Sequence, residues 1–138
     1  MGTEKTAGPV STRYPSGTLK RLDHRAKTEG QSRSTLIQRY VEEGLEMDEH
    51  PGIVFRSGPA GRRPGLVGGP DVWEVVAVFR SFDSVKRAAE WLDQPAGAIE
   101  TALRYYDGHR EEIDEWIRRN EEAAEAAERV ARARQAAS

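Results

Sequence analysis

The densest group of chemically versatile side chains lies between residues 111 and 115. Four carboxylates fall within this stretch: Glu111, Glu112, Asp114 and Glu115. Such a group could bind a metal ion or transfer protons. At helical spacing, however, the first shares a face with the last two, and Arg118 and Arg119 follow one turn later. The pattern therefore favours a ladder of surface ion pairs over a catalytic or metal site.

Other routes to catalysis are poorly represented. Cysteine is absent, and the three histidines, His24, His50 and His109, are widely separated in the sequence with no nucleophile beside them. The segment from Gly58 to Gly61 lacks the Lys-Ser/Thr ending of a phosphate-binding loop. We therefore expect no catalytic residue, no metal site and no cofactor, and interpret the protein as a non-enzyme.

Arg13 is the side chain best suited to recognising a base. It alternates with Ser11 along residues 9–15, on the face opposite Val10, Thr12 and Tyr14, and this period of two is typical of a strand. A guanidinium can donate two hydrogen bonds to guanine. Residues 1–40 carry eight Lys and Arg against three Asp and Glu. This local positive charge favours nucleic acid as a partner, the alternative being that Arg13 is only a solvated charge.

A second candidate contact lies where a helix is expected to begin. Ser32, Arg33 and Ser34 stand at the start of a predicted helix, a position that favours an anion. The preceding helix is expected from Ser16 to a left-handed cap at Gly30. The second helix ends in the acidic run before His50, so we place a domain boundary near residue 49.

One strand and two short helices cannot bury their own apolar side chains, and a single strand leaves its hydrogen bonds unmade. Two copies solve both problems if their strands pair as an antiparallel ribbon over four helices. We expect seven residues in this shared dimer core: Val10, Thr12, Tyr14, Leu22, Leu36, Ile37 and Tyr40. Residues 1–8 are expected to form a disordered arm.

These features together resemble the ribbon-helix-helix family of the MetJ, Arc and CopG repressors. The resemblance covers residues 9–47 and rests on Val10–Pro15, a helix, and then Gly30–Ser34 before a second helix. It implies a homodimer whose ribbon lies in the major groove of operator DNA. Ser11 and Arg13 would then contact bases, and Ser32, Arg33 and Ser34 would hold a phosphate.

Residues 50–117 predict a small helical domain that begins with a short hairpin or turn segment at 51–70. Helices are expected from Val72 to Ser81, after Asp83-Ser84, and after Pro95, continuing past Gly108. The helix expected after Asp83-Ser84 and the one after Pro95 have the spacing of a helix-turn-helix motif. However, residues 96–106 carry too little positive charge to favour a DNA contact. The tryptophans at 73, 91 and 116 are interpreted as core.

The second domain resembles the helical domain of VapB-type antitoxins. The resemblance rests on residues 50–53, 69–75, 105–106 and 109–113, and implies a toxin of the PIN-like ribonuclease class as partner. Residues 118–138 predict a charged helix or tail, which would block the toxin sterically through its arginines: Arg118, Arg119, Arg129, Arg132 and Arg134. The alternatives are a stand-alone repressor whose second domain senses a ligand or oligomerises, and an adaptor that binds no DNA.

The overall expectation is a mainly α, cytoplasmic dimer. It combines a ribbon-helix-helix module at 9–49, a small helix-turn-helix-like domain at 50–117 and a long C-terminal helix. The longest apolar run, Val75 to Phe79, is far shorter than the roughly 20 residues that a bilayer span needs.

Overall fold

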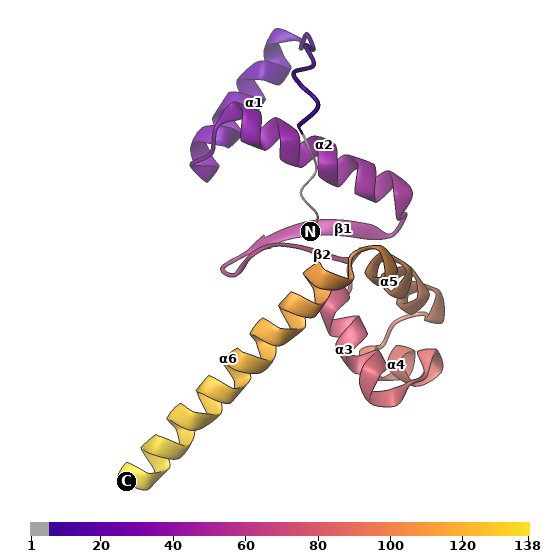
Figure 1. The fold of residues 1–138 in the computed structure, drawn as a ribbon, viewed down its shortest axis with the longest axis vertical. Helices are drawn as coiled ribbons and strands as arrows, with labels where there is room; N and C mark the ends of the chain where they lie inside the picture. Colours follow the sequence, from indigo (N-terminus) through magenta and orange to yellow (C-terminus); the bar gives the residue numbers. More distant parts are fainter. Residues whose placement is uncertain (1–5) are drawn as a thin grey trace. The chain divides into compact units, whose positions relative to one another are not determined.

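The computed structural model describes residues 6–138 and is mainly α-helical. In this part of the chain, six helices accompany a single two-stranded antiparallel hairpin (Figure 1). The chain divides into two compact units, Met1–Glu49 and His50–Ser138. No helix among the described residues is long and apolar enough to cross a membrane.

The first unit is a pair of helices, α1 (Ser16–Glu29) and α2 (Arg33–Glu49). Gly30 ends α1 in the left-handed conformation at φ 64°, as the sequence predicts. Ser32 caps α2 by accepting a 3.1 Å hydrogen bond from the amide of Thr35. The buried core of this unit consists of Leu22, Ala26 and Leu36.

The strand predicted over residues 9–15 is not formed in the single chain: residues 6–15 have no regular secondary structure. A strand is defined by hydrogen bonds to a neighbour, and the described part of this unit offers none, because both of its regular elements are helices. Of the predicted disordered arm at 1–8, residues 1–5 lie outside the described residues, and 6–8 are irregular and exposed.

The second unit begins with the predicted hairpin. Strands β1 (Ile53–Gly58) and β2 (Gly61–Leu66) pair from Ile53↔Leu66 to Gly58↔Gly61, so Pro59 and Ala60 make the turn. Four helices follow: α3 (Val72–Phe82), α4 (Val85–Leu92), α5 (Ala96–Gly108) and α6 (Arg110–Ala137). Ser84, directly before α4, caps this helix by accepting a hydrogen bond from the amide of Arg87.

The core of the second unit lies between the hairpin and the four helices. Val72, Val75 and Val76 of α3 are at most 1% exposed and pack against Ile99, Ala102 and Tyr105 of α5. Ile113 and Ile117 bring the first two turns of α6 into the same cluster. Beyond Ile117 every residue of α6 is exposed, and the helix extends away from the rest of its unit (Figure 1).

A buried carboxylate ties the hairpin to the start of α3. Asp71 is 5% exposed and accepts hydrogen bonds from Arg56 on β1, at 2.9 Å, from Arg63 on β2, and from the indole of Trp73, at 3.2 Å. The two arginines face each other across the hairpin in register. Because all three donors converge on one carboxylate, its buried charge is compensated by side chains of its own unit.

Candidate functional site

The first unit has an apolar groove between α1 and α2. It measures about 640 Å³ and is lined in part by Tyr14, Leu22, Ile37, Tyr40 and Val41. Tyr40 and Val41 remain 44% and 55% exposed. Among the described residues of the unit only three apolar side chains are buried, so more apolar surface faces solvent here than its own core can cover.

Four of the seven predicted dimer-core residues, Tyr14, Leu22, Ile37 and Tyr40, meet at this groove. Leu36 is completely buried between the two helices of its own chain. The other two, Val10 and Thr12, are exposed in the irregular segment before α1, and Val10 is 90% exposed.

The predicted base-contacting residues, Ser11 and Arg13, are both exposed in the same irregular segment. The chain therefore leaves their side chains accessible without holding them in a ribbon. A strand that pairs only with a second copy would give each of them a fixed direction, because alternate residues of a paired strand point to opposite faces.

The predicted phosphate contact at the start of α2 is partly occupied by the chain itself. Arg33 donates two hydrogen bonds to Asp23 of α1, Nε to Oδ1 at 2.7 Å and Nη2 to Oδ2 at 2.8 Å. The hydrogen bond from Arg33 holds the pKa of Asp23 below its ordinary value. Ser32 serves as the helix cap, and Ser34 is exposed in the first turn. Arg33 thus has an intramolecular competitor for a phosphate.

The arginines predicted to bind a toxin all lie on the exposed part of α6. Arg118 pairs with Glu115 and Glu122, Arg119 with Glu115 at 3.2 Å, and Arg132 with Glu128 at 3.3 Å. Arg129 and Arg134 are exposed as well. The surface of α6 is therefore a mixed ladder of charges.

The carboxylates at 111–115 split between two surroundings. Glu115 takes part in the predicted ladder with Arg118 and Arg119. Asp114 instead accepts hydrogen bonds from Arg80 of α3 and from the hydroxyl of Tyr106 at 2.8 Å. These contacts hold α6 against α3 and α5. Asp114 and Glu115 are therefore engaged in ion pairs and hydrogen bonds, as the sequence pattern favours.

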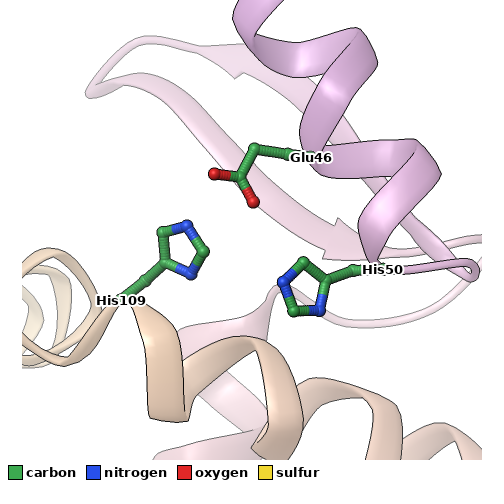
Figure 2. Close-up of side chains that lie close together, drawn as sticks. All are labelled: Glu46, His50 and His109. Carbon is green, nitrogen blue, oxygen red and sulfur yellow. The ribbon is translucent and has the colours of Figure 1, made fainter.

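Two of the three histidines come together, although the sequence suggests that all three are scattered. The ring centroids of His50 and His109 lie 5.8 Å apart, and one ring nitrogen of each lies within 4.8 Å of the other (Figure 2). Both residues belong to the second unit, whereas Glu46, also drawn in Figure 2, belongs to α2 of the first. His24 lies on α1.

The expectation that all three tryptophans are core is wrong for Trp91, which is 71% exposed. Helix α4 buries Ala88 and Ala89, and Trp91 projects about 110° from the centre of that stripe. Trp73 and Trp116 are partly buried, and Trp73 packs against the core.

Comparisons with known proteins identify no relative. No protein-family model, no curated protein and no solved structure matches this chain.

Proposed function

We propose that the chain is a DNA-binding regulator of the antitoxin type, which dimerises through its first unit and binds a partner protein through its second. The observation that carries the proposal is the incomplete first unit. A second copy of the same surface would cover the groove and the exposed Tyr40 and Val41, and would give the irregular segment 9–15 a neighbour with which to pair.

Dimerisation supplies the strand with its missing neighbour. When residues 9–15 of two copies pair antiparallel, Val10, Thr12 and Tyr14 turn toward the helices and cover their grooves. Ser11 and Arg13 then point outward from a two-stranded ribbon, which is an element that the major groove admits. The charge balance of residues 1–40, eight basic against three acidic side chains, favours phosphate.

The free length of α6 supports a protein partner for the second unit. Residues 118–137 make no contribution to the core, and only Val130 among them is a large apolar side chain, at 52% exposure. A helix whose side chains are all exposed is stabilised in a complex by the surface along which it lies. The resemblance to antitoxins makes a PIN-like ribonuclease the partner that we propose, with α6 covering the cleft that receives RNA.

The charge pattern refines this proposal. Arg118, Arg129 and Arg132 are separated by nearly whole numbers of helical turns and share one face of α6 with Glu122 and Glu125. A partner surface that matches this face must itself carry both signs of charge. A purely acidic cleft would meet the glutamates unfavourably.

The DNA proposal is tested with the full chain and the DNA upstream of its own gene. We expect specific binding by the wild type that weakens steeply with salt, and Arg13→Ala should lose roughly 1 to 3 kcal/mol of discrimination between sequences. Lys5→Ala is a control that removes one charge from residues 1–8 and should weaken binding to all DNA sequences equally. Absence of specific binding by the wild type would overturn the proposal.

The partner proposal is tested with a chain that ends at Ile117. Neutralisation of the ribonuclease encoded beside this gene should be lost, while DNA binding persists. Full inhibition by the shortened chain would eliminate the role of α6. Absence of any adjacent nuclease, combined with specific DNA binding, would instead establish the alternative of a stand-alone repressor.

A further inference from the structure

We propose that His50 and His109 form a two-histidine binding site for a divalent transition-metal ion in the second unit. Their ring centroids lie 5.8 Å apart, and a nitrogen of one ring lies within 4.8 Å of a nitrogen of the other (Figure 2). Both side chains are partly buried, which leaves access for an ion and for water.

The backbone holds both residues in defined places. The carbonyl of His50 accepts a 3.0 Å hydrogen bond from the amide of Ile53, where β1 begins. His109 separates α5 from α6: its amide donates to Tyr106, and its carbonyl accepts from Ile113. Because Ile53 and Ile113 belong to the same core, the two histidines are anchored to one rigid body.

Tyr105 orients the His109 ring. Histidines that bind a metal through one ring nitrogen commonly donate a hydrogen bond from the other nitrogen to a nearby acceptor, which fixes the ring. The Nδ1 of His109 lies 2.9 Å from the carbonyl oxygen of Tyr105. A carbonyl can only accept, so Nδ1 carries the proton and the lone pair of the neutral ring is on Nε2. The Tyr105 ring stacks on the imidazole at 3.9 Å with an interplanar angle of 2°. An ion bound at Nε2 would replace any hydrogen bond made there.

The separation fits coordination after a small adjustment. Bonds of about 2.0–2.1 Å to a tetrahedral ion place two ligand nitrogens about 3.4 Å apart. From the limit of 4.8 Å, the nitrogens need to approach by about 1.4 Å or less, which rotation of the His50 ring can supply. The His50 ring meets Tyr105 edge-on, at a centroid distance of 5.2 Å, whereas the His109 ring stacks on it.

The donor set selects the class of metal. Two neutral imidazoles suit Zn²⁺, Ni²⁺ and Cu²⁺ and discriminate against Mg²⁺ and Ca²⁺, which prefer oxygen ligands. Water completes the coordination. Such an ion would join the chain before β1 to the junction of α5 and α6, 59 positions later, and would therefore stabilise the second unit.

The test is a titration of the untagged full chain with ZnCl₂, followed by the imidazole nitrogen signals in NMR. Only three histidines contribute, so each ring can be resolved. We expect His50 and His109 to shift together at one midpoint, with the largest change at Nε2 of His109, while His24 stays unchanged. Equal shifts at His24, or no shift up to about 1 mM Zn²⁺, would overturn the proposal.

Variants identify the ligands independently. Loss of an outer partner already costs about 10–100-fold in metal affinity, so His50→Gln and His109→Gln should each weaken Zn²⁺ binding at least about tenfold. His24→Gln, on exposed α1, is the matched control and should bind as the wild type does. Zn²⁺ should raise the Tm of the wild type and of this control only. If His109→Gln does not fold, His50→Gln and the wild-type titration still decide.

Discussion

The ring of Tyr40 allows dimerisation to be tested quantitatively. A tyrosine presents about 200 Å² in total, so the 44% that is exposed here leaves about 90 Å² for a second copy to cover. At about 25 cal/mol per Å², complete burial contributes about 2 kcal/mol per protomer and about 4 to 5 kcal/mol per dimer. Tyr40→Ala should therefore raise the dimer dissociation constant about a thousandfold.

Sedimentation equilibrium of the full chain over a wide concentration range measures this constant. Trp91→Ala removes a more exposed aromatic ring from the second unit and should leave the constant unchanged. All three tryptophans lie between residues 73 and 116, so their fluorescence during urea unfolding verifies that Tyr40→Ala leaves the second unit intact. A wild type that is monomeric throughout, or an unchanged constant in Tyr40→Ala, would refute the reasoning.

Three further predictions concern carboxylates. Asp71→Asn removes the charge that holds Arg56 and Arg63, and should destabilise the second unit by about 2–4 kcal/mol. This is somewhat less than the cost of breaking a fully buried ion pair, because the two arginines are partly exposed to solvent. Urea unfolding followed by tryptophan fluorescence measures the change in the free energy of unfolding. Asp23→Asn should release Arg33 for a phosphate, which strengthens DNA binding and steepens the slope of log affinity against log salt by about 0.9 per added contact in each protomer. Unchanged affinity and an unchanged slope would show that Asp23 does not compete with DNA for Arg33. In NMR titration the pKa of Asp23 should lie below its ordinary value and return toward it in Arg33→Ala. Because the folded pKa is the lower one, the pair's contribution to stability is complete above the unfolded pKa and is lost as the pH falls through the folded pKa.

Local signals in the sequence predict most of the helices. The left-handed Gly30, the caps Ser32 and Ser84 and the apolar spacing in α3 and α5 act within a few residues of where they stand. The hairpin is likewise signalled by its glycines and prolines. The exposure of Trp91 could also have been predicted, because the buried face of α4, formed by Ala88 and Ala89, points in another direction.

Features that depend on partners distant in sequence could not be found in this way. The alternation at 9–15 predicts a strand that the single chain does not form, because alternation alone does not provide a neighbour to which the backbone can hydrogen-bond. The hydrogen bonds from Arg56 and Arg63 to Asp71 depend on the pairing register of β1 and β2, which places the two arginines opposite each other. His50 and His109 are brought together only when the hairpin packs beside the end of α5.

Pairing of residues 9–15 between two copies is tested most directly by NMR on a mixture of isotope-labelled and unlabelled full-length chains. Filtered spectra report only contacts between different copies. The account predicts intermolecular contacts between Val10, Thr12 and Tyr14 of one copy and the same segment of the other, together with slow exchange of the paired amides. A dimer in which this segment shows no intermolecular contact and exchanges rapidly would contradict the proposed DNA-reading ribbon.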